Sequence, residues 1–339
     1  MKIAVGISNQ PIYIQNSILK PFKRRLFYQS NAWAYRFIIY LRQEGIKCDL
    51  VEMDKNDWIQ KLKPYDLVIW KPQFMGVRSS QNFKEKIFFI QYFMKKRVYP
   101  NYETVWHFDS KIAQSYIFRY QKIRTPETFV SFDYNEAMHH AIRLNYPVVV
   151  KESSGASSSG VSLVKSCRNL MRYINSRFLW ENLLSRKLSS RIFDRFGHLY
   201  TQRFLRGNSC DLRITIIGDR YVFGFWRKNR NNDFRASGSG RIDYESRLPK
   251  DIISYCARIS KMNHFDSMAY DILFRKDKFY IVEMSYGYND RAVYNCRGYY
   301  VLDEKCEISD FVEGHYWPQQ LWVRWLLDNM QDCSKLARK

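Results

Sequence analysis

Residues 148–164, VVVKESSGASSSGVSLV, join two short apolar runs through a loop of serine and glycine. The two runs predict strands, and the loop between them predicts a hairpin with a mobile tip. Small residues let backbone N–H groups and hydroxyls approach phosphate oxygens closely, and Lys151 adds a positive charge beside the loop. The alternative is a flexible surface turn, because such clusters are common in loops. The pattern is not a P-loop, which requires G-x-x-x-x-G-K-[ST] ahead of a helix.

Upstream of this hairpin, the first third of the chain alternates strand and helix patterns. Short apolar runs predict strands at residues 2–6, 48–53 and 66–70. Residues 30–45 predict a helix that begins at Ser30 and ends at Gly45. This alternation predicts a parallel sheet flanked by helices. Residues 71–105, with a basic helical pattern at 83–96, lead to the next lobe.

Downstream of Gln202 the pattern changes to strands, with one helix among them. Strands are predicted at residues 212–217, 221–226, 268–274 and 279–284, and a helix at residues 250–262. Helices are also predicted in the middle of the chain, at residues 110–120, 134–144 and 169–195. We therefore expect a mixed α/β (α+β) protein.

Two acidic residues lie in the last pair of predicted strands. Asp271 and Glu283 are separated by a turn, so an antiparallel hairpin would bring their side chains to one face. Their neighbours are mostly apolar, and a buried carboxylate requires a cation. Mg²⁺ prefers oxygen ligands, so the pair is a candidate metal site. The alternative is two acids on surface strands.

Three arginines lie in and just after the first two of these predicted strands. Arg213 lies in the motif Asp211-Leu-Arg213, Arg227 ends the next strand, and Arg235 lies in Asp233-Phe-Arg235. Guanidinium groups bind phosphate and carboxylate with two parallel hydrogen bonds. We expect the three to form a cluster near the carboxylate hairpin, with more backbone donors from residues 237–240.

The charge is strongly unbalanced, with 55 Lys+Arg against 33 Asp+Glu and a formal net charge of +22. This favours anionic partners, although a basic surface without a specific role is the alternative. The seven cysteines form no Cys-x-x-Cys motif, which argues against a zinc knuckle and against a disulfide framework. Because no signal peptide or membrane span is evident, we expect a cytoplasmic protein, with peripheral membrane association as an option.

The order of these motifs resembles the ATP-grasp superfamily, and within it the RimK-type amino-acid ligases. The resemblance runs from about Val105 to Gly287, roughly half of the chain. It implies an ATP-grasp fold preceded by a Rossmann-like domain. The implied domains are residues 1–105, a central subdomain with the phosphate-binding hairpin at 106–200, and a subdomain with the metal site at 201–339.

The resemblance also implies roles for individual residues. Nucleotide binding is implied for Lys111, Lys151, Ser153, Ser154, Gly155, Ser158, Ser159, Gly160, Gln202, Arg203, Phe204, Leu205 and Asp211. Relatives often have an acid where this chain has Arg203. Arg213, Arg227 and Arg235 would face phosphate or the bound carboxylate. Asp271, Glu283 and Ser285 correspond to the metal ligands. The third position is usually Asn, so we expect Ser285 to bind through water, Asn289 to compensate, or one metal site to be weakened.

The implied activity is an ADP-forming ligase that activates a carboxylate as an acyl phosphate and joins it to an amine. Its cofactors would be ATP and Mg²⁺, with Mn²⁺ as an alternative metal. Basic residues such as Lys20, Lys23, Arg24 and Arg25 suggest an acidic acceptor, for example a cell-surface glycan precursor or a peptide, with an amino acid as the amine.

Other hypotheses remain open. A natural-product peptide ligase is a second enzymatic hypothesis, and a catalytically inactive nucleotide-binding homologue is another. A specific nucleic-acid binder ranks last, because no RNP-type or helix-turn-helix signature occurs. No Gly-x-Ser-x-Gly motif or persuasive Cys/His pair suggests a covalent nucleophile, and the six histidines are assigned to structure or surface.

Overall fold

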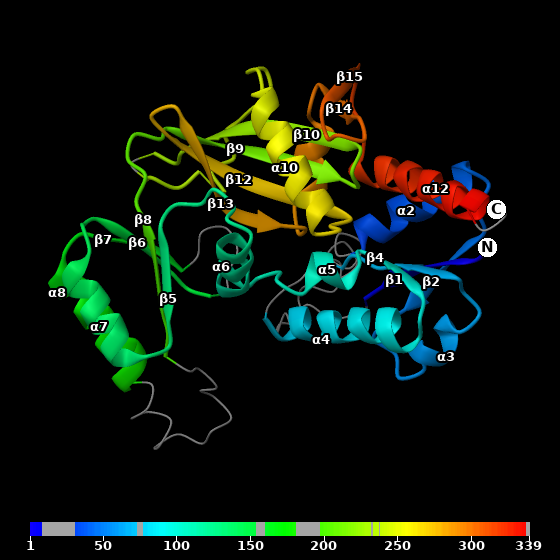
Figure 1. Cartoon of the computed structure of the whole chain (residues 1–339). Helices are drawn as coiled ribbons and strands as arrows, with labels where there is room; N and C mark the ends of the chain where they lie inside the picture. Colours follow the sequence, from blue (N-terminus) through cyan, green and yellow to red (C-terminus); the bar gives the residue numbers. More distant parts are fainter. Residues whose placement is uncertain are drawn as a thin grey trace, which may run out of the picture.

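A computed structural model describes residues 1–8, 31–72, 77–153, 160–180, 197–231, 233–236 and 238–336. Three β-sheets organise these residues, and helices pack on each of them (Figure 1). The predicted mixture of helices and strands is therefore confirmed. None of the helices in the described part of the chain combines the length and the apolar character that a membrane span requires.

The N-terminal sheet is parallel, as the alternating pattern predicted, and has the strand order β2-β1-β3-β4. Its strands are β1 (Ile3–Ile7), β2 (Cys48–Glu52), β3 (Leu67–Ile69) and β4 (Arg97–Tyr99). Its helices are α2 (Ala32–Gln43), α3 (Trp58–Leu62), α4 (Val77–Phe88) with the π-helical turn η2 (Phe89–Phe93), and α5 (Tyr102–Val105). Every residue of β1 is buried, as expected for a strand covered on both faces.

The central sheet is antiparallel, with the order β5-β8-β6-β7. Its strands are β5 (Thr128–Ser131), β6 (Val148–Lys151), β7 (Val161–Val164) and β8 (Leu199–Arg203). The helices α7 (Tyr134–Arg143) and α8 (Cys167–Asn175), which continues as η3 (Ser176–Trp180), lie side by side and share a core with the sheet (Figure 1). The hairpin of β6 and β7 confirms the strand–loop–strand pattern at residues 148–164.

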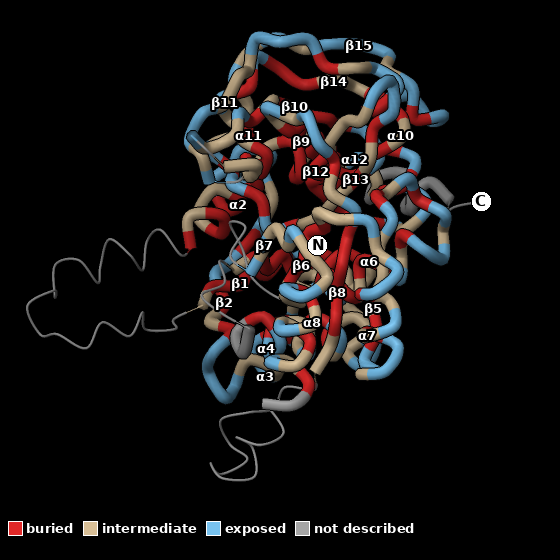
Figure 2. The backbone as a smooth tube through the Cα atoms, turned by 90° about the vertical axis from the view of Figure 1, so that its left-hand side faces the viewer, coloured by how far each residue is buried: buried red, intermediate tan, exposed pale blue. Residues whose placement is uncertain are grey.

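The C-terminal sheet is the largest, with the order β13-β12-β9-β10-β14-β15 and with β11 beside β10. Its strands are β9 (Cys210–Ile217), β10 (Tyr221–Lys228), β11 (Ile242–Asp243), β12 (Ser267–Arg275), β13 (Lys278–Ser285), β14 (Gly298–Leu302) and β15 (Ile308–Glu313). The helix α10 (Lys250–Met262) contacts β9 and β12. Figure 2 shows buried residues along β8, β9 and β12, whereas β15 at the sheet's edge is largely exposed.

The C-terminal helix α12 (Pro318–Leu336) packs against α2 of the N-terminal lobe, where Figure 1 shows the two helices together. The Trp322 ring lies 5.7 Å from Phe37 and 6.5 Å from Trp33, measured between ring centroids. This aromatic core joins the two ends of the chain.

Some predicted elements differ from the structure. The helix predicted at residues 169–195 begins at Cys167, because Ser166 caps it by accepting a hydrogen bond from the N–H of Asn169, and residues 181–196 lie outside the described part. Ser30 also lies outside the described residues, and α2 begins at Ala32. The predicted domain boundary at residue 200 falls inside strand β8. The division of the chain into domains at residues 105 and 200 stays a prediction.

Candidate active site

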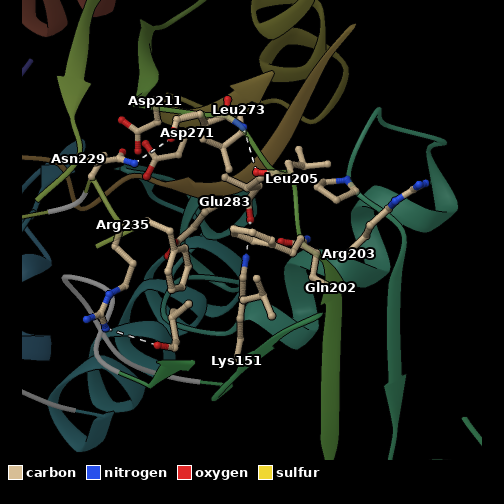
Figure 3. Close-up of a pocket in the computed structure, with 18 of the residues that line it drawn as sticks. Lys151, Gln202, Arg203, Leu205, Asp211, Asn229, Arg235, Asp271, Leu273 and Glu283 are labelled. Carbon is tan, nitrogen blue, oxygen red and sulfur yellow. Dashed lines mark hydrogen bonds between the residues drawn. The ribbon is translucent and has the colours of Figure 1, made fainter. Parts of the chain in front are cut away.

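A cavity lies between the central and C-terminal sheets and is lined by residues of β6, β8, β9, β12 and β13 (Figure 3). We name it the first cavity; its walls include Val149, Lys151, Gln202, Leu205, Asn229 and Leu273. A second cavity adjoins it and is lined by Arg213, Arg227, Gly240, Ser285, Gly287 and Asn289. Asp271 and Glu283 line both cavities, so these two carboxylates stand at their junction.

Lys151 lies at the end of the buried strand β6 and reaches across to the C-terminal sheet. Its Nζ donates a hydrogen bond to the backbone oxygen of Val282, at 3.2 Å (Figure 3). Burial lowers the pKa of Lys151 to about 8; Glu283 opposes that shift and Lys111 reinforces it. The ammonium therefore connects two lobes at the floor of the first cavity.

A β-bulge explains why the oxygen of Val282 is available. Asp271 pairs with Glu283, but the next residue, Ile272, pairs with Ile281, so Val282 is an extra residue in β13. A bulged residue has no partner in the ladder, and bulges are frequent beside active sites. Here the extra carbonyl accepts the Lys151 ammonium. The prediction of a regular hairpin did not include this irregularity.

Lys111, the first residue of α6 (Lys111–Tyr120), is the second buried lysine of the site. Ser110 caps this helix by accepting a hydrogen bond from the N–H of Ala113. The Lys111 N–H donates to the oxygen of Ser153, at 2.8 Å. Its Nζ lies 4.0 Å from Glu283 Oε1. The structure thus brings Lys111 and Lys151 to the same carboxylate, as two cations that phosphate oxygens would contact.

The carboxylates of Asp271 and Glu283 lie on one face of the β12–β13 hairpin, since directly opposed residues share a face. Asp271 is buried, whereas the Glu283 side chain is 38% exposed. In the described part of the chain, no group of three or more His, Cys, Asp and Glu forms a metal site. Two carboxylates still fit Mg²⁺, which keeps several waters and takes further oxygens from phosphates.

Asp271 belongs to a buried network of four charges. Arg213 donates to both of its oxygens at 2.7 and 2.8 Å, and Arg227 donates to one of them at 2.8 Å. Arg227 also binds Asp211 with two hydrogen bonds, at 2.7 and 2.6 Å. Burial alone would raise the pKa of Asp271, but the two guanidinium groups outweigh it and hold that pKa well below its usual range.

All three predicted arginines line a cavity that also contains Asp271 and Glu283, but they divide between the two cavities. Arg213 and Arg227 lie together at the second cavity, whereas Arg235 lines the first cavity and binds Asp233. One N–H of Arg235 reaches the oxygen of Val161 in the central sheet, at 3.4 Å. Backbone hydrogen bonds close the loop that carries this pair: the Arg230 N–H donates to the oxygen of Arg235 at 3.0 Å, and the Asp233 N–H donates to the oxygen of Arg230 at 3.2 Å.

Residues 202–205, which the resemblance implied to bind nucleotide, run from the end of β8 along the first cavity. Gln202 donates to Thr128 Oγ1, at 3.0 Å, and Leu205 is buried. Arg203 is exposed, and Figure 3 shows its guanidinium group directed away from the other labelled residues. Asn229, which the sequence analysis did not select, has a buried Oδ1 with no hydrogen-bond partner in the described part of the chain.

The Oδ1 atom of Asn229 helps to test whether a nucleotide fits the first cavity. A buried acceptor without a partner is costly, and a donor on a bound ligand would satisfy it. The apolar residues Val149 and Leu205 and the Lys151 ammonium in the same lining suit a molecule with an aromatic base and a charged tail. The donor set therefore fits ATP.

Ser285 and Asn289 both line the second cavity, and both are engaged in local hydrogen bonds. Ser285 Oγ accepts from the N–H of Gly287 at 3.0 Å, and Asn289 Oδ1 caps α11 (Asp290–Tyr294) by accepting from the N–H of Ala292 at 3.1 Å. If Asn289 were to bind a metal through Oδ1, it would share that oxygen with the cap.

Several predicted residues lie outside the described residues. They are Ser154, Gly155, Ser158 and Ser159 of the hairpin loop, and Lys20, Lys23, Arg24 and Arg25 near the N-terminus. Gly160, at the end of that loop, is described. It has φ of +74°, and an added Cβ would lie 2.6 Å from Glu152 Cγ, so glycine is required there.

Lys71 is a buried cation that sequence analysis missed. It follows β3, and its Nζ lies 3.5 Å from the centroid of the Trp33 ring and 5.2 Å from that of Tyr288. Burial lowers its pKa to about 7, and Asp290 opposes the shift. Aromatic faces stabilise such an ammonium. The only sign of this site in the sequence is the Trp70-Lys71 pair at the end of an apolar run. The aromatic partners of Lys71 cannot be read from that pair, because Trp33 lies in a separate helix and Tyr288 is more than 200 residues away.

A family model, the RimK-like ATP-grasp domain, matches residues 109–289. The chain is 26% identical over 186 residues to an α-aminoadipate–LysW ligase, LysX, of Saccharolobus solfataricus, covering 55% of this chain and 64% of that protein. It is 24% identical to a coenzyme γ-F420-2:α-L-glutamate ligase of Methanococcus maripaludis, covering 54% and 60%. The chain therefore spans less than two thirds of these relatives.

Among solved structures, the fold is similar to that of the D-cycloserine synthetase DcsG. The TM-score is 0.57 at 13% identity, and the match covers 96% of this chain and 100% of that one. At this identity the likeness concerns the fold alone, and it extends over all three sheets.

Proposed function

The chain belongs to the RimK-like ATP-grasp family, and on this premise we propose that it is an ATP-dependent ligase that joins a carboxylate to an amine and releases ADP. One observation carries the proposal. Two buried lysines, Lys111 and Lys151, converge on Glu283 at the junction of the first and second cavities. A phosphoryl group passing from one cavity to the other would cross this point.

The first cavity is the proposed nucleotide site. Val149 and Leu205 would contact the base, Asn229 Oδ1 would accept a hydrogen bond, and Lys111 and Lys151 would bind phosphate oxygens. The roles of Gln202, Phe204 and Asp211 in the same wall are part of this proposal. Arg203 also lines this wall with an exposed side chain, so its contact with the base would be through the backbone.

The junction is the proposed metal site, with Asp271 and Glu283 as the carboxylate ligands and Ser285 beside them. When bound, ATP with Mg²⁺, or with Mn²⁺ in its place, supplies the γ-phosphoryl group that activates the substrate carboxylate. Glu283 is half-exposed and free to turn toward a cation, while Arg213 and Arg227 hold Asp271 ionised. Catalysis of this kind depends on positioning and charge neutralisation, so no covalent nucleophile is required.

The second cavity is the proposed site for the carboxylate and the amine. Arg213 and Arg227 line it, and their forks suit carboxylate and phosphate oxygens. After the phosphoryl group has been transferred to the carboxylate, the amine nitrogen attacks the carbonyl carbon and phosphate leaves. The high positive charge of the chain favours an acidic substrate, such as a peptide or a glycan precursor, with an amino acid as the amine.

The proposal is tested by measuring ADP release with panels of carboxylates and amines. A ligase of this kind sustains ADP release over many turnovers only when both substrates are present, because the amine consumes the acyl phosphate. ADP release that never depends on an added carboxylate and amine would contradict the proposal.

A second candidate function is an inactive homologue that binds nucleotide. The observation in its favour is that Ser285 Oγ and Asn289 Oδ1 accept backbone N–H groups, and that both oxygens of Asp271 accept guanidinium N–H groups. Nucleotide binding without any ADP release across the whole panel would support this candidate.

A further inference from the structure

A third cavity lies on the opposite face of β9 and β10 from the charge network. It is lined by Trp226, Lys228, Arg230, Arg241, Asp243 and Arg247. Successive residues of a strand point to opposite faces, so Lys228 and Trp226 face away from Arg227, which binds Asp211 and Asp271. The sheet therefore lies between the third cavity and the second, whereas the third cavity shares Asn229 with the first.

The third cavity carries an excess of positive charge. Four cationic side chains line it, against one carboxylate, Asp243. Asp243 accepts hydrogen bonds from the N–H groups of Glu245 and Ser246 and from the Ser246 hydroxyl, at 2.7 to 3.0 Å. The hydrogen bonds of the Asp243 carboxylate therefore go to residues 245 and 246 of the same turn. In the described part of the chain, no carboxylate forms an ion pair with Lys228, Arg241 or Arg247.

Strand β11 and the residues before it line both the second and the third cavity, with alternate residues on opposite faces. Gly240 and Ile242 line the second cavity, whereas Arg241 and Asp243 line the third. Strand β11 lies at the edge between these two faces, so a molecule lying along it can reach both cavities. One extended molecule can therefore place a reacting group in the second cavity and further groups in the third.

Strand β11 favours a peptide as that molecule. Among the described strands it pairs only with β10, through Trp226–Asp243 and Arg227–Ile242, so its outer edge is unpaired. An extended peptide can add to such an edge, with its side chains alternating between the two sides. Carboxylates on that peptide would meet the guanidinium and ammonium groups of the third cavity.

We propose that the third cavity is an anion-binding subsite that holds side-chain carboxylates of an acidic peptide whose reacting carboxylate lies in the second cavity. This inference rests on the proposed ligase function, and it narrows the substrate from any acidic molecule to an acidic peptide. Lys228 and Arg247 are specificity-determining residues in this scheme, because they lie outside the nucleotide and metal sites.

The test measures binding of a fluorescein-labelled poly-glutamate peptide to the full chain by anisotropy, without nucleotide. The double variant Lys228→Ala/Arg247→Ala should lose about tenfold in affinity, since each exposed ion pair is worth up to about 1 kcal/mol. The matched control, Lys63→Ala/Lys305→Ala, removes the same charge from exposed positions elsewhere and should change the affinity less than about twofold. Equal losses in both, or no peptide binding at all, would overturn the proposal.

Competition identifies the class of ligand. Unlabelled poly-glutamate should displace the labelled peptide at lower concentration than polygalacturonate of equal charge; the reverse order would overturn the peptide assignment in favour of an acidic glycan. ADP release is measured in parallel. Peptide binding that depends on Lys228 and Arg247 without ADP release would refute the ligase function but not the subsite. ADP release with unaltered binding in the double variant would refute the subsite alone.

Discussion

Arg213 holds Asp271 with two hydrogen bonds, from Nε to Oδ1 at 2.7 Å and from an Nη to Oδ2 at 2.8 Å. The two residues face each other across β9 and β12. Arg227 contacts both carboxylates of the network, at 2.6 Å from Asp211 and 2.8 Å from Asp271. Two acids and two arginines thus balance in charge within the sheet, which is what allows them to be buried.

Replacing Arg213 should destabilise the fold. In Arg213→Gln, Asp271 loses the guanidinium group that donates to both of its oxygens inside a buried network. The free energy of unfolding should fall by about 3 kcal/mol. Urea denaturation checks this. The control is Arg235→Gln, whose more exposed pair with Asp233 should cost less than about 1 kcal/mol. Similar losses for the two variants would mean that the network contributes no more than a surface pair.

Glu283→Gln should abolish ADP-forming turnover while ATP still binds. The amide keeps the shape of the side chain but loses the negative charge that a cation and Lys111 both require. Turnover assays with isothermal titration of ATP check the two parts. Glu304→Gln, an exposed acid in the same lobe, should behave as the unmodified chain. Full activity of the Glu283 variant would remove it from the metal site.

Ser285→Asn should be tolerated, and the Mg²⁺ concentration needed for half-maximal turnover should stay the same or fall. An amide oxygen is a better metal ligand than a hydroxyl, and the position lines the second cavity next to Glu283. Ser285→Ala is the matched control, and it should need as much Mg²⁺ or more. A higher Mg²⁺ requirement in the Asn variant than in the Ala variant would show that position 285 does not face the metal.

Lys151→Ala should weaken ATP binding by about 1.5–3 kcal/mol, the range for a hydrogen bond to a charged group. The fold should persist, since β6 keeps its ladder with β7 and β8. Fluorescent-nucleotide titration measures the affinity, and circular dichroism checks the fold. Lys165→Ala removes an exposed lysine from the same lobe and should leave the affinity unchanged. Unchanged affinity in both variants would exclude Lys151 from the nucleotide site.

His107 should make the fold sensitive to acid. Burial, with a further contribution from Lys84, lowers its pKa from 6.5 to about 3, and its ring nitrogens have no hydrogen-bond partner in the described part of the chain. As the pH falls, the unfolded chain binds a proton at His107 at a higher pH than the folded chain does. The contribution of neutral His107 to the free energy of unfolding is therefore fully present above pH 6.5 and is lost as the pH falls toward 3.

The variant His107→Phe should therefore lose less stability between these pH values, because Phe keeps the contact with Phe265 and has no proton to bind. Denaturant midpoints across the range measure the difference. The control is His139→Phe, at an exposed position, whose pH profile should follow that of the unmodified chain. Identical profiles for the two variants would show that the His107 ring does not stay neutral.

Local sequence was sufficient to predict the alternating strands and helices, the parallel N-terminal sheet, the hairpin at residues 148–164 and the pairing of Asp271 with Glu283. These features depend on hydrophobic period and on turn residues, which act over a few positions. The order of motifs was also enough to suggest the family, which the match over residues 109–289 bears out. The roles of the individual site residues stay predictions.

Only the tertiary structure decided how the charges are paired. The bulge at Val282 provides an acceptor for Lys151, and cross-strand register, not spacing along the chain, sets Arg213 and Arg227 on Asp271 while Arg235 turns to Asp233. Likewise, α12 meets α2 and Lys71 meets Trp33 and Tyr288 through packing between distant segments. Such contacts depend on how whole elements fit together, and no local pattern encodes that fit.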